Sequence, residues 1–356
     1  MYDGLIKNVE EKLKKTTLLL LCLSLIAVAC GGSDEEVEKI TFGFVPSAEQ
    51  TDLQDNIQPL MDVLSEGLGI EVEGFVTSDY SGLIVAMGSG QADIGAFNTL
   101  GYVNAMNAYP DSLEAIAKVV RYGSGSYHGT FFTNDASICN EPPVIGALEN
   151  IDGSATLVKG SADNAPEVKA LQVGWVFGDN GLEPDPDHEA GLACEADLSV
   201  LLGKTVAFVE EGSTSGYLFP AIQLKNAGID YQSDFNVIFA GSHDASVLAV
   251  YNGDADFGIA YDDARRSIRK EYPDVGSKVI AFSITEEIPN DVVAVRSNLP
   301  EDIKEQIYQI LSDYLATDEG LEVMDEIYGW TDIVPAVNAE FDIVKQAAEE
   351  FGLYDE

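Results

Sequence analysis

Residues 39–45, KITFGFV, form the stretch from which the fold of the chain can be worked out. β-Branched and aromatic residues dominate this stretch, and Pro46 and Ser47 follow it as turn formers. In the next segment, 53–67, apolar residues recur at the spacing of an α-helix. Strand and helix patterns then alternate through residues 70–76, 80–89, 92–97 and 100–108. Such alternation with short connections predicts a parallel sheet with helices on both faces.

A second α/β half follows residue 200. Strands are predicted at 205–209, 237–240, 255–260, 279–282 and 292–296, and helices at 214–228, 245–251, 301–315, 320–327 and 341–351. The two halves together predict two lobes, each a mostly parallel sheet flanked by helices, with a ligand cleft between them. Ligands of such sheets lie beyond the carboxyl ends of the strands, which here are the loops after residues 45, 76 and 97.

Residues 138–200 interrupt this alternation. The segment is rich in Gly, Pro, Asp and Asn, and it is bracketed by Cys139 and Cys194. In an exported protein two such cysteines predict one disulfide, so we interpret residues 139–200 as an insertion held at its base. Trp175 inside it is expected to form a small local core. With 3 His in the chain and no cluster at zinc spacing, neither a metal site nor a cofactor is expected.

The N-terminal segment has the pattern of a secretory leader. The apolar run 16–29 follows several lysines and is shorter than the ~20 residues of a bilayer-spanning helix. Residues 27–30, AVAC, resemble a lipobox, which predicts a leader over residues 1–29 and a lipid on Cys30. The polar residues that follow predict a flexible tether over 30–37. An ordinary cleaved signal peptide and an uncleaved anchor are the alternatives.

The charge of the chain excludes several partners. It has 61 acidic and 19 basic side chains and a formal net charge of -42. Such a chain repels nucleic acid and cannot form a polybasic membrane patch. A hydrophobic content of 46% also excludes an intrinsically disordered chain.

Hydroxyl residues gather at 211–217, EGSTSGY, between a predicted strand and a predicted helix. Ser213, Thr214 and Ser215 can cap the helix, and the free N–H groups of a helix start can bind an anion. Capping alone and anion binding are both open interpretations of this motif.

An enzyme is the weaker interpretation of the same segment. The pattern resembles a nucleophile elbow, but its central residue is Thr214, and His243 precedes Asp291, unlike the acid-before-His order of α/β-hydrolases. The sequence also contains no nucleotide-binding glycine pattern and no cluster of ligands for a metal that could activate water. A hydrolase that uses Ser215 and His243 is therefore an alternative, and we expect a binding protein that is not an enzyme.

Eight blocks in order carry a resemblance to a known family. They are 41–47 (TFGFVPS), 78–83 (SDYSGL), 86–94 (AMGSGQADI), 123–131 (GSGSYHGTF), 212–220 (GSTSGYLFP), 240–245 (AGSHDA), 250–263 (VYNGDADFGIAYDD) and 288–292 (IPNDV). The chain resembles the phosphonate/phosphite/phosphate-type substrate-binding proteins of ABC importers. The resemblance implies a two-lobed type 2 periplasmic-binding fold that closes over its ligand. Lobe 1 is expected over residues 38–132 and 283–356, and lobe 2 over 133–282, where the insertion departs from the family.

The resemblance also implies a ligand set. The implied residues are Tyr80, Tyr127, Ser213, Thr214, Ser215, His243, Asp263 and Asp291. In this set Ser213 to Ser215 hold the phosphoryl oxygens, and Asp263 meets a substrate amine, as a carboxylate does in aminophosphonate-binding members. Since the set contains no Lys or Arg, the anion is expected to meet hydroxyls, amide dipoles and a protonated His243. Asp291 can accept a hydrogen bond from a P–OH group, which would favour protonated phosphorus oxyanions over sulfate.

The function implied by the resemblance is solute capture for transport. We expect a monomer, lipid-anchored in the periplasm or on the outer face of the cytoplasmic membrane. It would bind a small phosphonate, phosphite or phosphate and deliver it to the membrane permease of an ABC importer. The alternatives are the hydrolase and a receptor or adhesin derivative that has lost its ligand.

Overall fold

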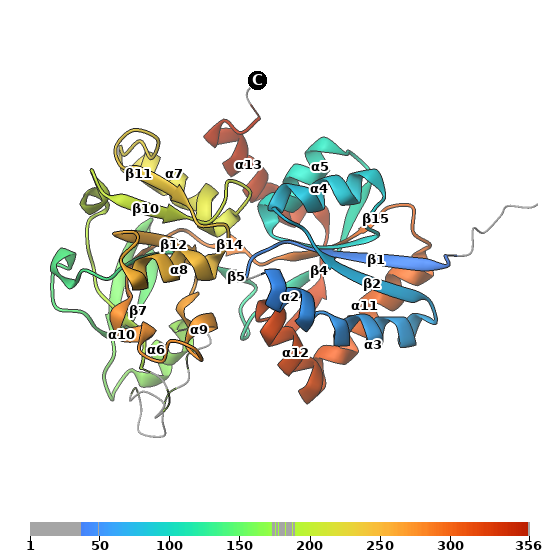
Figure 1. Cartoon of the computed structure of the whole chain (residues 1–356), viewed down its shortest axis with the longest axis horizontal. Helices are drawn as coiled ribbons and strands as arrows, with labels where there is room; N and C mark the ends of the chain where they lie inside the picture. Colours follow the sequence, from blue (N-terminus) through green and yellow to red (C-terminus); the bar gives the residue numbers. More distant parts are fainter. Residues whose placement is uncertain are drawn as a thin grey trace, which may run out of the picture. The chain divides into compact units, whose positions relative to one another are not determined.

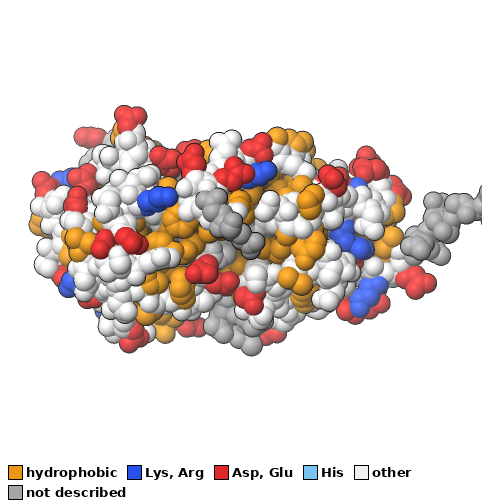
Figure 2. Space-filling model, turned by 90° about the horizontal axis from the view of Figure 1, so that it is seen from above, with side chains coloured by type: hydrophobic (Ala, Val, Ile, Leu, Met, Phe, Trp, Pro, Cys, Tyr) orange, Lys and Arg blue, Asp and Glu red, His pale blue; other side chains and the backbone are white. Residues whose placement is uncertain are grey.

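The computed structural model describes residues 37–48, 50–172 and 189–354, together with 175, 177, 182 and 187 (Figure 1). The predicted leader 1–29 and lipidation site Cys30, and all of the tether but its last residue, lie outside the described residues. From Lys39 onward the chain forms one compact unit. No helix in the described part of the chain has the length and apolarity needed to cross a bilayer. On the face seen in Figure 2, acidic side chains outnumber Lys and Arg, as the composition requires.

The sheet of lobe 1 has the strand order β16-β4-β15-β3-β1-β2. Its strands are β1 (Lys39–Phe44), β2 (Glu71–Val76), β3 (Ile94–Phe97), β4 (Leu113–Val120), β15 (Val292–Arg296) and β16 (Asp332–Pro335). The helices of this lobe are α2 (Gln50–Asn56), α3 (Gln58–Leu68), α4 (Tyr80–Ser89), α5 (Thr99–Ala108), α11 (Glu301–Leu315) and α12 (Asp318–Tyr328). Phe42 and Phe44 of β1 are fully buried, so the opening stretch of the sequence lies in the core.

The sheet of lobe 2 has the order β11-β10-β12-β6-β13-β9-β7-β8. Its strands are β6 (Gly129–Thr133), β7 (Val144–Ile151), β8 (Ser154–Lys159), β9 (Leu192–Ala193), β10 (Thr205–Phe208), β11 (Asn236–Phe239), β12 (Phe257–Tyr261) and β13 (Ile280–Ile284). The helices are α6 (Ala165–Leu171), α7 (Phe219–Asn226), α8 (His243–Asn252), α9 (Arg265–Ile268) and α10 (Val275–Lys278), and a π-helical turn, Thr214–Leu218, precedes α7. The C-terminal helix α13 (Asp342–Phe351) packs on both α5 and α7, and so contacts both lobes.

The α/β class and the two-sheet architecture are confirmed, but the expectation of mostly parallel sheets is wrong. Only β2-β1-β3 and β11-β10-β12 form parallel triplets among the described strands. β15 runs antiparallel to β3, and β6 runs antiparallel to β12. The reason is that β15 and β6 each follow a crossing from the other lobe. Each of these two strands therefore begins beside the carboxyl ends of the parallel strands and runs in the opposite direction.

The two crossings between the lobes pair with each other. β5 (Ser126–Tyr127) and β14 (Ile288–Pro289) form a two-stranded antiparallel ribbon, which we call the hinge ribbon. The chain thus leaves lobe 1 within residues 121–128 and returns within 285–291. The predicted boundaries at 132 and 283 differ from this by a few residues, because β6 and the end of β13 belong to the sheet of lobe 2.

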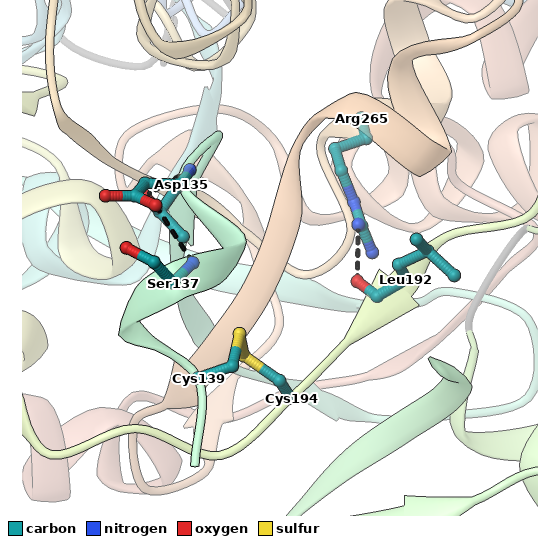
Figure 3. The surroundings of a disulfide bond; sticks show 7 residues. Asp135, Ser137, Cys139, Leu192, Cys194 and Arg265 are labelled. Atoms are coloured by element: carbon teal, nitrogen blue, oxygen red, sulfur yellow. Dashed lines mark hydrogen bonds between the residues drawn. A yellow bond between two sulfur atoms is a disulfide. The ribbon is translucent and has the colours of Figure 1, made fainter. Parts of the chain in front are cut away.

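The insertion extends the sheet of lobe 2. β7, β8 and β9 add to it beside β13, and α6 lies against β7. The predicted Cys139–Cys194 disulfide is present, with a Cα–Cα distance of 5.7 Å, and Figure 3 shows it beside the Leu192 carbonyl that accepts from Arg265. Trp175 is 7% exposed and packs in a cluster with Phe132 of β6. The expectation of a small local core is therefore wrong, because Trp175 joins the core of lobe 2 and so attaches the insertion to the sheet.

Loss of the disulfide is expected to destabilise the protein. The bond closes a sequence separation of 55 residues, and the entropy of the unfolded chain then makes it worth ~4 kcal/mol. We expect the Cys139→Ser/Cys194→Ser variant to lose about this much free energy of unfolding in urea titration. Reduced wild-type protein should match the variant, and equal stabilities of oxidised and reduced protein would contradict the prediction.

Candidate ligand-binding site

The loop after β10 carries the hydroxyl motif into the region where the lobes meet. Ser213, Thr214 and Ser215 are all buried. The Ser213 hydroxyl accepts a hydrogen bond from Gly216 N at 3.1 Å, so the capping interpretation of the motif is confirmed for this residue. Gly216 lies close to Val209, where a Cβ would meet the valine Cγ2 at 2.3 Å. Only glycine allows the turn to close this tightly.

The Thr214 hydroxyl contacts lobe 1. Its Oγ1 accepts hydrogen bonds from Leu100 N at 2.9 Å and from Asn98 Nδ2 at 3.0 Å. Asn98 Nδ2 also donates to the carbonyl of Gly212 at 2.8 Å. The motif of lobe 2 is thus bonded to the segment that directly follows β3 of lobe 1.

Tyr80 opens α4 and faces the same loop. It is 1% exposed, and its hydroxyl is buried with no hydrogen-bond partner among the described residues. Burial raises the pKa of Tyr80, and the nearby Tyr328, Glu210 and Tyr127 raise it further. A buried hydroxyl without a partner is uncommon in proteins, and such a group marks a place where another polar group can bind.

Tyr127 comes from the hinge ribbon. Burial raises its pKa, as does the charge of Asp291, whereas Arg121 and the hydroxyls of Ser215 and Thr214 lower it. These influences locate Tyr127 beside both the hydroxyl motif and Asp291. Tyr80, Tyr127, the three hydroxyl residues and Asp291 therefore lie in one region, as the ligand set predicted from the sequence requires.

Arg121 also lies in this region, although it is not in the ligand set predicted from the sequence. It forms an ion pair with Asp291, and both side chains are 14% exposed. Its Nε donates to the carbonyl of Tyr328 at 2.9 Å, and its guanidinium carbon lies 5.6 Å from the centre of the Tyr127 ring. The predicted ligand set, which contains no Lys or Arg, therefore lacks a cation that lies beside two of its members. An arginine alone at the end of β4 has no motif around it that would have identified it.

Two further residues were missed by sequence reasoning. Tyr328 at the end of α12 donates its hydroxyl hydrogen bond to the carbonyl of Val45 at 2.5 Å, and burial together with Asp291 raises its pKa. Asn98 follows β3 directly, in one of the loops that the carboxyl-end rule had singled out. Its position could have been found from the sequence, but its bond to Thr214 could not.

His243 begins α8 and is neutral. Its backbone N–H donates to the carbonyl of Ser47 in lobe 1 at 3.2 Å, and its Nδ1 accepts from Tyr261 N at 3.0 Å. Burial, with a smaller effect of Arg121, lowers the pKa of His243 from 6.5 to about 3. The expectation of a protonated His243 is therefore wrong, because burial and a cation both oppose a second proton. The imidazole keeps its proton on Nε2, which leaves one donor for a ligand.

Asp263 is not brought to this region. Its carboxylate is bound by Nε and Nη2 of Arg265 and by Trp175 Nε1, which donates at 2.9 Å. The ion pair with Arg265 and these hydrogen bonds keep the pKa of Asp263 low despite full burial. The Oδ2 atom of the neighbouring Asp262 lies 3.3 Å from Nδ1 of His128. The carboxylate predicted to meet a substrate amine is thus committed to the interior of lobe 2.

Comparison with known proteins identifies the family. A family model described as ABC transporter, phosphonate, periplasmic substrate-binding protein matches residues 42–341. The chain belongs to this family. This confirms the resemblance carried by the eight sequence blocks, and an extracytoplasmic location follows from it. The family consists of transport proteins, which disfavours the hydrolase alternative.

The relatives of this chain have low sequence identity to it. The phosphate-import protein PhnD of Mycolicibacterium smegmatis is 29% identical over 256 residues, which cover 68% of this chain and 63% of that protein. The phosphonates-binding periplasmic protein of Escherichia coli is 22% identical over 316 residues, which cover 89% of this chain and 78% of that protein. The structure of PhnD1 from Prochlorococcus marinus in complex with methylphosphonate matches with a TM-score of 0.64 at 18% identity, covering 89% of this chain and 99% of that one. That likeness confirms the two-lobed fold.

The low pKa of His243 predicts a specific acid sensitivity. The unfolded imidazole takes up a proton below pH 6.5, whereas the folded one does so only near pH 3. The unfolded state therefore binds more protons in this range, and stability falls as the pH decreases from about 6.5 to about 3. We expect His243→Asn, whose Oδ1 can accept from Tyr261 N, to flatten the dependence of Tm on pH in this window. An NMR titration in which the His243 imidazole becomes protonated near pH 6.5 would contradict this.

Proposed function

We propose that this protein is the extracytoplasmic binding component of an ABC importer and captures a small phosphorus oxyanion between its lobes. Phosphonate, phosphite and phosphate are the candidate ligands. The proposed ligand residues are Tyr80, Tyr127, Ser213, Ser215, His243 and Asp291, with Arg121 beside them. Family membership and the arrangement of these residues support the proposal.

The observation that carries the proposal is the unpartnered hydroxyl of Tyr80. This hydroxyl is buried, and its neighbours include Tyr127 and Ser213. Leaving a buried donor unsatisfied costs about 1–3 kcal/mol, which a phosphoryl oxygen would recover. An oxyanion with several acceptor oxygens can take hydrogen bonds from Tyr80, the motif hydroxyls and His243 Nε2 at once. A cationic ammonium ligand, which has no acceptor, could not satisfy these donors.

The charge balance of the site favours an anion that keeps one proton. Arg121 and Asp291 form a pair with no net charge, and His243 is neutral. The remaining polar groups are hydroxyl and amide donors, which stabilise negative charge without a formal cation. Asp291 is an acceptor when ionised, and a P–OH group of the ligand can donate to it. Sulfate has no proton to donate at neutral pH, and its oxygen would be repelled there.

The commitment of Asp263 to Arg265 argues against an amine-selective site. A substrate ammonium group needs a carboxylate that is not already paired, and that of Asp263 is held by Arg265 and Trp175. We therefore propose that the substituent of the ligand is not recognised through an amine. This narrows the candidates to phosphate, phosphite and simple alkylphosphonates.

Delivery and anchoring complete the proposed function. Family membership implies permease subunits as partners, and the lipobox-like residues 27–30 support a lipid on Cys30. The binding protein would work as a monomer tethered to the membrane. Mass spectrometry of the protein purified from its native membrane, which would detect the diacylglyceryl group on Cys30, tests the anchor separately from ligand binding.

A thermal-shift panel tests the ligand class. We expect phosphate, phosphite or methylphosphonate to raise Tm, since a ligand at 100 times its Kd adds about 2.7 kcal/mol to stability. Sulfate should give no shift. 2-Aminoethylphosphonate should bind no more tightly than ethylphosphonate, because Asp263 is already paired. The proposal fails if no phosphorus oxyanion shifts Tm, and a clear preference for the amine would refute the interpretation of Asp263.

Substitution of Asp291 tests the selection of a protonated anion. Asn can donate as well as accept, so Asp291→Asn should narrow the ratio of methylphosphonate to sulfate affinity by about 10-fold or more, the equivalent of one hydrogen bond to a charged group. Calorimetry with both anions measures the ratio. Since the change also leaves Arg121 unpaired, Tm is recorded in parallel. A variant that binds methylphosphonate as tightly as the parent and still excludes sulfate would contradict the role of Asp291.

A further inference from the structure

Two helices of lobe 1 have their first N–H groups bound by side chains of lobe 2. The first residues of α5 would ordinarily be capped by Asn98, but its side chain makes no capping hydrogen bond to its own helix. Leu100 N donates instead to Thr214 Oγ1 at 2.9 Å. At the start of α4, Asp79 caps Gly82 N within its own helix at 2.7 Å. α5 therefore depends on a cap from the other lobe, whereas α4 has one of its own.

A second contact of the same kind lies beside the first. Tyr80 N, at the first position of α4, donates to both carboxylate oxygens of Glu210 at 3.3 and 3.4 Å. Glu210 and Thr214 lie on the same loop after β10. Between them, Gly212 packs so closely that a Cβ there would lie 2.6 Å from the Cβ of Tyr80. One loop of lobe 2 thus contacts the N-terminal ends of two lobe 1 helices.

We propose that Thr214 is a positioning residue that caps α5 across the lobe interface and thereby couples ligand binding to lobe closure. This inference rests on the proposed function, because it assigns Thr214 a role within the same hydroxyl motif. It also separates Thr214 from its neighbours. The phosphoryl contacts belong to Ser213 and Ser215, and Thr214 holds the motif in place.

The hydrogen bonds of Thr214 favour this division of roles. A hydroxyl has two acceptor lone pairs and one proton. Leu100 N and Asn98 Nδ2 occupy the acceptor positions at 2.9 and 3.0 Å, and Thr99 Oγ1 lies 3.3 Å away as a further partner. Both acceptor positions of the Thr214 hydroxyl are therefore used by lobe 1, and Tyr127 is a further neighbour of this hydroxyl. The Ser213 hydroxyl accepts from Gly216 N and lies beside the Tyr80 hydroxyl, so it lies among the proposed ligand residues.

The energetic consequence follows from burial. When the lobes separate, water can solvate Leu100 N and the Asn98 amide, so the open state loses little without Thr214. In the closed state both donors are buried, and without the Thr214 oxygen they would remain unpaired. Removing this oxygen therefore penalises the closed state specifically. Since the ligand is held only in the closed state, its affinity falls even though no ligand contact has been removed.

The test compares two valine substitutions. Thr214→Val removes the hydroxyl at nearly constant volume, and Thr130→Val makes the same change in β6, where the buried hydroxyl has no described partner. Affinities for inorganic phosphate and methylphosphonate are measured by calorimetry, and amide hydrogen exchange is measured at Leu100 and Gly82. We expect Thr214→Val to lower affinity about 10- to 100-fold and to speed exchange at Leu100 but not at Gly82. Thr130→Val should change neither, and Thr214→Ser should stay close to the parent.

A double-mutant cycle with Asn98→Ala distinguishes positioning from direct ligand contact. If Thr214 acts through the lobe interface, the two substitutions together cost clearly less affinity than the sum of the single losses. Additive losses, or unchanged exchange at Leu100 in Thr214→Val, would overturn the proposal. If the parent binds neither anion, the proposed function fails, and the exchange comparison at Leu100 still decides whether the cap exists. Thr214→Ser and Asn98→Ala keep the test valid if the valine variant does not fold.

Discussion

The ion pair between Arg121 and Asp291 is the interaction on which both the fold and the site depend. Arg121 follows β4 and Asp291 precedes β15, so the pair joins the outgoing and returning crossings between the lobes. Asn290 strengthens the junction, since its amide donates to the carbonyl of Ser124 at 2.8 Å. The hinge ribbon lies directly beyond this junction and carries Tyr127. The residues that hold the lobes together are therefore the same residues that supply charge and shape to the site.

Much of the fold could be predicted because several core strands have a clear local sequence pattern. β1, β3 and β12 are short apolar runs followed by turn residues, and the blocks around them carry the family pattern. β4 was not predicted, since its sequence LEAIAKVV contains Ala, Glu and Lys, which favour helices locally. The period-two burial of this strand depends on its place in the sheet between β15 and β16, which both come much later in the chain. The prediction of parallel strands was wrong for a similar reason. The direction of β15 and β6 depends on the lobe from which the chain arrives, and no local pattern shows this.

The sequence could predict residues that the fold brings together, but it could not predict their charge states. Tyr80, Tyr127 and the hydroxyl motif carry local patterns that survive without tertiary information. The protonation of His243 and the pairing of Asp263 depend on burial and on Arg121 and Arg265, which no local pattern connects to them. The pairing of Arg265 with Asp263 two residues earlier was in reach of the sequence, but their shared burial against Trp175 was not. Charge states at a site are properties of the packed interior, and spacing alone does not give them.

The pairing of the buried cations has a consequence for how the ligand arrives. Arg265 and Lys304 are 2% and 6% exposed, and each is paired with a carboxylate. The chain has 61 acidic and 19 basic side chains, and because each buried cation is neutralised by its carboxylate partner, the outer surface keeps the strongly negative net charge of the composition. An approaching anion is then repelled until it reaches the lobe interface, and added salt screens that repulsion. Ligand association should accordingly become faster as ionic strength rises, the reverse of the electrostatic steering by which many anion-binding proteins collect their ligands.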